Sequence, residues 1–368
     1  MMKIGFVGLL TIGVCAAMVM ALGACRHDDP VIEELVGYDG SPYSFSYGAF
    51  PAPAIASDNA LTVQGVKLGR MLFYETALSL DGNMSCASCH RQEHAFSDTT
   101  RFSIGVHGLP GKRQAMGVFN MAWNENNFFW DGRAELLRDQ SLKPIQDSLE
   151  MAETLDHVVS KLNGMQAYRD QFTRAFGSDE ITPLKMSLAM EQFMNSIVSV
   201  ESKYDRYLTG AAALTESEDR GRELFFAEYN QFFPDESGAD CAHCHSPKNF
   251  ENDQYMNNGL ESDASLLDVG RLSVTNDPAD RGKMKVPSLR NVALTAPYMH
   301  DGRFSTLEEV LDHYNSGLVA SSTLDPELEN TRGTGLMLSD QDKQDIIAFL
   351  HTLTDEVLPT RSEFSDPF

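Results

Sequence analysis

Four of the six cysteines stand in two copies of one pattern that could hold a metal-bearing group. Each copy has two thiols separated by two residues and followed at once by a histidine. The copies are Cys86, Cys89 and His90, then Cys241, Cys244 and His245. Thiols at this spacing can bond to two vinyl groups on one porphyrin edge, and the next imidazole can bind the iron. A redox-active thiol pair or a zinc site would not require a histidine after each pair. The sequence therefore predicts two covalently bound haem c groups.

The segments around these patterns also repeat, as two similar structural units would require. Residues 69–75 (Gly-Arg-Met-Leu-Phe-Tyr-Glu) precede the first pattern, and residues 221–228 (Gly-Arg-Glu-Leu-Phe-Phe-Ala-Glu) precede the second. Further along, residues 130–133 (Trp-Asp-Gly-Arg) match residues 300–303 (His-Asp-Gly-Arg). An amphipathic helix that leads into a haem pattern is typical of cytochrome c. We therefore predict a mostly α fold with little strand, made of two cytochrome c-like helical domains that each carry one covalent haem c.

Length and composition divide the chain further. A chain of 368 residues is long for a single core, which favours two domains. We expect a lipoprotein signal peptide at 1–24, a tether and lead-in segment at 25–57, and an N-terminal cytochrome c-like domain at 58–210. A C-terminal cytochrome c-like domain at 211–355 and a tail at 356–368 complete this prediction.

The N-terminus has the pattern of an export signal. Lys3 precedes an almost wholly apolar stretch, and Leu22, Gly23 and Ala24 stand directly before Cys25, which resembles a bacterial lipobox. An ordinary signal peptide and a transmembrane anchor are the alternatives. The lipobox predicts export to the periplasmic side of a bacterial membrane, with a lipid anchor on Cys25.

The net charge of −24 argues against nucleic acid as a partner, because nucleic acid requires a basic surface. Such a charge is compatible with a basic protein partner, because complementary fields raise encounter rates. Simple solubility of an exported protein explains the charge equally well.

Taken together, these motifs resemble the bacterial dihaem cytochrome c peroxidases, which include the MauG-type enzymes that oxidise a partner protein. The resemblance covers about residues 60–355. It rests on the two haem patterns and on residues 129–134, 144–151, 286–291 and 296–298. It implies that the N-terminal haem reacts with hydrogen peroxide, while the C-terminal haem relays or stores oxidising equivalents.

The resemblance assigns catalytic roles to three residues of the first half. Gln140 and Glu150 match the family's distal pair, and a carboxyl group there can move a proton between the two oxygens of peroxide. Trp130 matches the tryptophan that lies between the two haems. The alternative for Glu150 is a surface carboxylate, and the alternative for Trp130 is core packing.

The sixth ligand of the second haem distinguishes the branches of the family. Many members use methionine, but the corresponding position here is Tyr314, as in the MauG-type branch. A phenolate favours oxidised iron, so this haem would store an oxidising equivalent. A core tyrosine, with Met299 or Met337 as the ligand, is the alternative.

Two further sites are weaker matches. His107 lies near the family's displaceable distal histidine but one residue out of register; it could bind iron, line the pocket mouth or lie in an exposed loop. His94 follows its own haem pattern closely and is a poorer candidate. The family's calcium ligands would be Gln114, Thr295 and Pro297, although glutamine replaces the expected asparagine.

Three functions are therefore distinguished. The first is a peroxidase that takes electrons from a small cytochrome c or a cupredoxin. The second is a MauG-type enzyme that oxidises Trp or Tyr side chains of a partner protein; Tyr314 favours it, and Ala239, where that enzyme has a tryptophan, weakens it. The third is a pure electron-transfer cytochrome, against which Glu150 and Gln140 argue. The oligomeric state is left open, with a homodimer as one option.

Overall fold

The structure is a computed structural model that describes residues 36–233 and 236–368. The predicted signal peptide, Cys25 and the start of the tether lie outside the described residues. Helices joined by long irregular segments make up the described part, and its one two-stranded ribbon pairs β1 (Tyr255–Met256) with β2 (Met284–Lys285) in antiparallel register. The predicted mostly α fold with little strand is confirmed. In the described ranges, no helix has the length and apolar character needed to cross a membrane.

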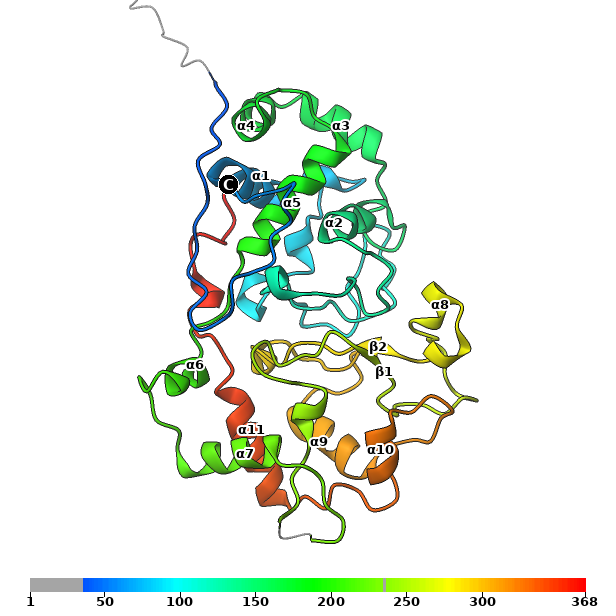
Figure 1. Cartoon of the computed structure of the whole chain (residues 1–368). Helices are drawn as coiled ribbons and strands as arrows, with labels where there is room; N and C mark the ends of the chain where they lie inside the picture. Colours follow the sequence, from blue (N-terminus) through cyan, green and yellow to red (C-terminus); the bar gives the residue numbers. More distant parts are fainter. Residues whose placement is uncertain (1–35, 234–235) are drawn as a thin grey trace, which may run out of the picture. The chain divides into compact units, whose positions relative to one another are not determined.

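The first group of helices encloses one apolar core (Figure 1). The group contains α1 (Val63–Tyr74), α2 (Leu137–Gln146), α3 (Leu155–Asn163), α4 (Gln166–Phe176) and α5 (Pro183–Ser196). Leu68, Leu72 and Phe193 at its centre are completely buried.

The second group encloses a separate core, in which Phe225, Ile346 and Phe349 are buried. Its helices are α6 (Lys203–Leu208), α7 (Glu216–Phe226), α8 (Leu272–Thr275), α9 (Leu307–Ser316), α10 (Pro326–Thr331) and α11 (Asp340–His351). Capping boxes start α7 at Thr215 and α11 at Ser339, where the side chain of each cap and a carboxylate three residues later satisfy free backbone N–H groups.

The repeated glycine before each haem pattern has a packing reason. α1 packs against α5, and α7 packs against α11. A Cβ atom on Gly69 would lie 1.9 Å from the carbonyl oxygen of Ala189, and one on Gly221 would lie 1.8 Å from that of Asp345. Any larger residue would force the paired helices apart, so both halves keep glycine at the helix crossing.

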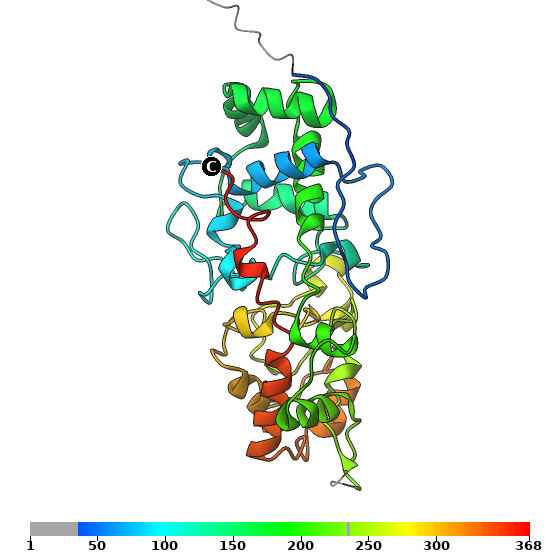
Figure 2. The same cartoon turned by 90° about the vertical axis from the view of Figure 1, so that its left-hand side faces the viewer.

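The chain does not stay within the predicted domain limits at two places. Tyr204 on α6 packs in the second core, although the sequence placed residues up to 210 in the first domain. The segment after 355 returns to the first half, where Leu358 and Phe364 are buried in the first core (Figure 2). Both departures follow from burial of large apolar side chains, which decides with which core a segment packs.

Candidate active site

Each haem pattern forms a single tight helical turn. Cys86–Ser88 and Cys241–His243 are 3₁₀ turns, and the histidine N–H that follows each pattern donates to the carbonyl of the first cysteine, at 2.9 Å for His90 and 2.8 Å for His245. The four thiols form no disulfide. Two free thiols and an imidazole are therefore held together on one turn in each half.

Both turns border one large cavity of about 1210 Å³ that extends through the two halves. Cys89 and His90 line it on one side, and Cys241, Cys244 and His245 line it on the other. Most of the predicted site residues line this same cavity. These are Gln140, Glu150, Trp130, Tyr314, Gln114, Thr295 and Pro297.

The two histidines are prepared to bind a metal through the same ring nitrogen. His90 Nδ1 lies 2.9 Å from the carbonyl oxygen of Phe96, and His245 Nδ1 lies 3.1 Å from that of Phe250. A proton on Nδ1 makes these hydrogen bonds and leaves the lone pair of Nε2 free for iron. Burial lowers the pKa of His90 and lowers that of His245 to about 4, so both rings are neutral at pH 7. The thiols, the imidazoles and the cavity fit a haem group in each half.

The first half of the cavity contains a carboxyl group that can exchange a proton near neutral pH. Gln140 comes from α2, and Glu150 follows the turn after that helix. The backbone of Glu150 is fixed, because its N–H donates to Asp147 (3.0 Å) and its carbonyl accepts from Val106 (2.9 Å). Burial raises the pKa of Glu150 to about 7, the negative charge of Asp147 adds to this shift, and Arg133 opposes it. A carboxyl group with this pKa is suited to general acid–base work.

Trp130 lies where the two halves meet. Its indole N–H donates to the carbonyl of Gln114 (2.8 Å), and its ring contacts that of His300 edge to face at 6.5 Å. The halves exchange matching backbone bonds here, from Gln114 N–H to His300 (2.8 Å) and from Lys285 N–H to Trp130 (2.7 Å). The repeated Trp/His-Asp-Gly-Arg loops thus face each other, each bonded to the opposite half.

A buried ion cluster crosses the same junction. Arg113 of the first half forms two hydrogen bonds to Asp268 of the second, at 2.7 and 2.8 Å, and a third to Asp131 at 2.6 Å. The charged neighbours raise the pKa of Arg113, against the effect of burial, so the guanidinium stays charged. Sequence reasoning missed this cluster, because Asp268 has no counterpart in the repeat.

The second half of the cavity holds Tyr314 on α9. The amide nitrogen of Asn258 lies 3.5 Å from the Tyr314 hydroxyl and 3.3 Å from the sulfur of Met299, so the two candidate ligands are neighbours. Met299 lines the cavity, whereas Met337 is 41% exposed and does not. The geometry therefore leaves Tyr314 and Met299 as candidates. Burial raises the pKa of Tyr314 to about 12 in the absence of a metal.

The weaker predictions have mixed outcomes. His107 is an exposed loop residue, and neither it nor His94 is among the residues that line the cavity. A distal histidine at the first haem stays a prediction. Gln114, Thr295 and Pro297 all line the large cavity, but the Gln114 amide donates to the Ser97 hydroxyl (2.9 Å). Calcium stays a prediction.

A second, half-buried carboxyl group, Glu251, was not predicted. It lines the cavity directly after Phe250, and one of its oxygens accepts from the Asn249 amide at 2.5 Å. Burial raises its pKa to about 7, and Asp253 adds to the shift. Comparison of the two repeats could have found it. Phe250 matches Phe96, so Glu251 stands where the first half has Ser97.

Comparisons with known proteins agree with this site. Residues 63–213 match the di-haem cytochrome c peroxidase family, described as CCP_MauG. The chain is 33% identical to the methylamine utilization protein MauG of Methylophilus methylotrophus over 83% of this chain and 86% of that protein. The chain belongs to the dihaem cytochrome c peroxidase family. It is thus an oxidoreductase of the peroxidase type that uses haem.

Two further relatives show the breadth of the family. The cytochrome c551 peroxidase of Nitrosomonas europaea is 36% identical over 71% of this chain and 75% of its own length. The crystal structure of a MauG-like protein associated with microbial copper homeostasis superposes with a TM-score of 0.79 at 34% identity, covering 88% of this chain and 98% of that one. Peroxidases and MauG-type proteins are both similar to this chain, so similarity alone does not choose between them.

Proposed function

We propose that the protein reduces hydrogen peroxide to water in the first half of the cavity, with one haem c bound covalently in each half. The observation that carries this proposal is the position of Glu150 and Gln140 in the cavity that His90 borders. A protein that only passes electrons needs no buried acid with a pKa of about 7. The second haem then relays or stores oxidising equivalents.

Glu150 moves the proton in this scheme. Its carboxylate accepts the proton of the peroxide oxygen that binds and then donates it to the oxygen that leaves, so that water departs instead of hydroxide. The haem, when bound, supplies the electrons that cleave the oxygen–oxygen bond. The amide of Gln140 holds the peroxide by hydrogen bonds, and it stays uncharged throughout the reaction.

Trp130 connects the halves in this proposal. Its ring lies at their junction with its N–H bonded to a backbone carbonyl, which cannot accept the proton permanently. An electron can therefore leave the indole without a coupled proton loss, and this favours rapid exchange. Substitution Trp130→Phe should slow electron exchange between the haems at least tenfold, as followed by stopped-flow absorbance. An unchanged rate would remove Trp130 from the path.

A MauG-type activity toward a partner protein is the second candidate, and Tyr314 favours it. The phenol lies in the cavity on the His245 side, where a phenolate would stabilise oxidised iron. Mixing the oxidised protein with one equivalent of peroxide separates the candidates. A long-lived oxidised state of both haems supports the MauG-type reaction, whereas a need for prior reduction of one haem supports electron donation by a small cytochrome c or a cupredoxin.

We also propose that Cys25 carries a lipid anchor on the periplasmic side of a bacterial membrane. The apolar stretch and the residues Leu22, Gly23 and Ala24 before Cys25 support this. Cys25→Ala should release the protein into the soluble fraction. A variant that stays with the membrane, together with an unmodified Cys25 in the wild type, would contradict the anchor.

A further inference from the structure

The segment 248–250, which follows the second haem pattern, is held at three consecutive carbonyl groups. All three accept hydrogen bonds from the segment 288–290. The bonds run from Arg290 Nε to Lys248 (2.9 Å), from Ser288 Oγ to Asn249, and from Leu289 N–H to Phe250 (3.2 Å). The last of these carbonyls is the one that lies 3.1 Å from His245 Nδ1. The acceptor for the iron-binding histidine is thus fixed by a clamp outside the haem pattern.

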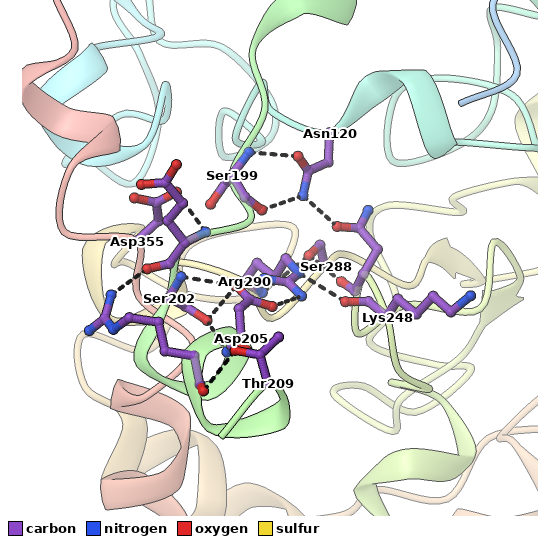
Figure 3. A network of polar contacts seen from close by, with 12 residues as sticks. Asn120, Ser199, Ser202, Asp205, Thr209, Lys248, Ser288, Arg290 and Asp355 are labelled. Atoms are coloured by element: carbon purple, nitrogen blue, oxygen red, sulfur yellow. Dashed lines mark hydrogen bonds and ion pairs between the residues drawn. The ribbon is translucent and has the colours of Figure 1, made fainter. Parts of the chain in front are cut away.

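Arg290 is the anchor of this clamp. The side chain is 2% exposed, and its two terminal nitrogens donate to the Asp205 carboxylate at 2.8 Å each (Figure 3). Its guanidinium also lies over the ring of Phe50, 4.7 Å from the centroid. These contacts hold the planar guanidinium of Arg290 in one orientation, so its hydrogen bond to the Lys248 carbonyl is held in place as well.

The first half carries no such clamp at the matching positions. Asn120 and Asn291 correspond, because both have a positive φ (55° and 57°) and both start a 3₁₀ turn. This register aligns Gly117 with Ser288 and Phe119 with Arg290. Neither glycine nor phenylalanine has a side chain that donates a hydrogen bond, so the carbonyl of Phe96 opposite His90 lacks this support.

We propose that Arg290 is a positioning residue that aims the Phe250 carbonyl at His245 and thereby lowers the reduction potential of the second haem. A firmly held acceptor at Nδ1 makes the imidazole a stronger electron donor, which stabilises ferric iron. This inference rests on the proposed binding of the second haem by His245. It gives one structural cause by which the two haems would differ in reduction potential although the two halves have similar folds.

The sign of the potential change separates positioning from simple charge. Arg290→Gln removes a positive charge, and that loss alone would stabilise ferric iron and lower the potential. Loss of the clamp has the opposite effect, because a loosened Phe250 carbonyl weakens the electron donation of His245. Arg290→Lys keeps the positive charge but loses the planar guanidinium. Only a positioning role therefore predicts that this variant changes the reduction potential of the second haem.

The test is a spectroelectrochemical titration of the purified dihaem protein that resolves the two haems. For Arg290→Gln and Arg290→Lys we expect the reduction potential of the second haem to rise by about 59 mV, which is about a tenfold shift of its ferric–ferrous ratio. The potential of the first haem should stay unchanged. Arg220→Gln is the control, because Arg220 also pairs with two carboxylates in this half (Asp342 and Asp345) but does not touch segment 248–250.

A second potential that falls or stays fixed in both Arg290 variants overturns the inference. If a single variant does not fold, the double variant Asp205→Asn with Arg290→Gln removes both charges together, and the same rise is expected. A wild-type protein that lacks a second haem by mass spectrometry would contradict the proposed function instead.

Discussion

The two halves of the molecule share a frame and differ where they face the cavity. Each half pairs the helix before its haem pattern with its last helix at a glycine, and the carbonyl of a phenylalanine lies beside its histidine. On the first side, Glu150 and Gln140 lie in the cavity, whereas Tyr314 lies in it on the second. The repeat therefore explains why haem is expected in both halves, and the departures from the repeat support the proposed difference between the two haems.

Two half-buried carboxyl groups make this difference testable. Glu150 and Glu251 both line the cavity, and burial raises the pKa of each to about 7. The Asn249 amide beside Glu251 is already bonded to that carboxyl group (2.5 Å), whereas Gln140 lines the cavity in the half that holds Glu150. Burial alone would give both residues a role, whereas the proposed function gives the peroxide chemistry to one of them.

The largest expected effect comes from this pair. Glu150→Gln keeps the size and hydrogen bonding of the side chain but removes the ionisable group, so peroxide reduction should fall by about 10²–10⁴. The matched variant Glu251→Gln should keep the wild-type rate. Steady-state assays on samples of equal haem content provide the comparison. Equal losses in both variants would mean that the halves are not divided as proposed.

Tyr314→Phe is the next most disruptive change. It deletes one oxygen, so the second haem should lose its ligand and change its spectrum, and its potential should rise if Met299 takes the site. The first haem should keep its spectrum. Tyr298→Phe is the control, because Tyr298 also lines the cavity but its hydroxyl donates a hydrogen bond to the backbone carbonyl of Val292. A Tyr314→Phe protein with unchanged spectra and potentials would make Tyr314 a packing residue.

The pH profile tests Glu150 in the unmodified protein. Only its carboxylate can accept the peroxide proton, and its pKa is raised to about 7. The value of kcat/KM for peroxide should therefore rise about tenfold per pH unit up to about pH 7 and then level off. In Glu150→Gln this rise of kcat/KM with pH should be absent. A wild-type profile that is flat between pH 5 and 8 would argue against an acid–base role.

A smaller effect concerns stability. Folding raises the pKa of Glu251 to about 7, so the folded state binds the proton more tightly than the unfolded state does. The folded state therefore loses stability as the pH rises from the ordinary pKa of a glutamate toward about 7. Glu251→Gln removes this loss and should stabilise the protein at pH 8 by about 1–3 kcal/mol, with little gain at pH 4. Urea unfolding at both pH values measures this, with the exposed Glu93→Gln as control. Equal gains at both pH values would indicate a packing effect.

Much of this architecture could be predicted, because it depends on local patterns. The haem turns, the capping boxes at Thr215 and Ser339, and the two-core layout follow from spacing and periodicity. The return of Phe364 to the first core could not be predicted, because it depends on which apolar surface stays open after both cores form.

The site divides in the same way. Glu150, Gln140, Trp130 and Tyr314 were predicted from motifs, and all four line the cavity. Glu251 was missed although it stands at the position that matches Ser97 in the repeat. Arg113 and Arg290 were missed because their partners lie far away in the chain. Arg113 meets Asp268, and Arg290 meets Asp205, only once the halves have folded.

The binding of cyanide to each haem tests the central division most directly. Cyanide needs an open iron position, so it should bind the first haem of the oxidised protein. It should leave the second haem unchanged, because Tyr314 would close that site if it is the ligand that we propose. In Tyr314→Ala, both haems should bind it. Electron paramagnetic resonance resolves the two haems and reports which one has changed. Cyanide binding first to the second haem of the wild type would contradict the account.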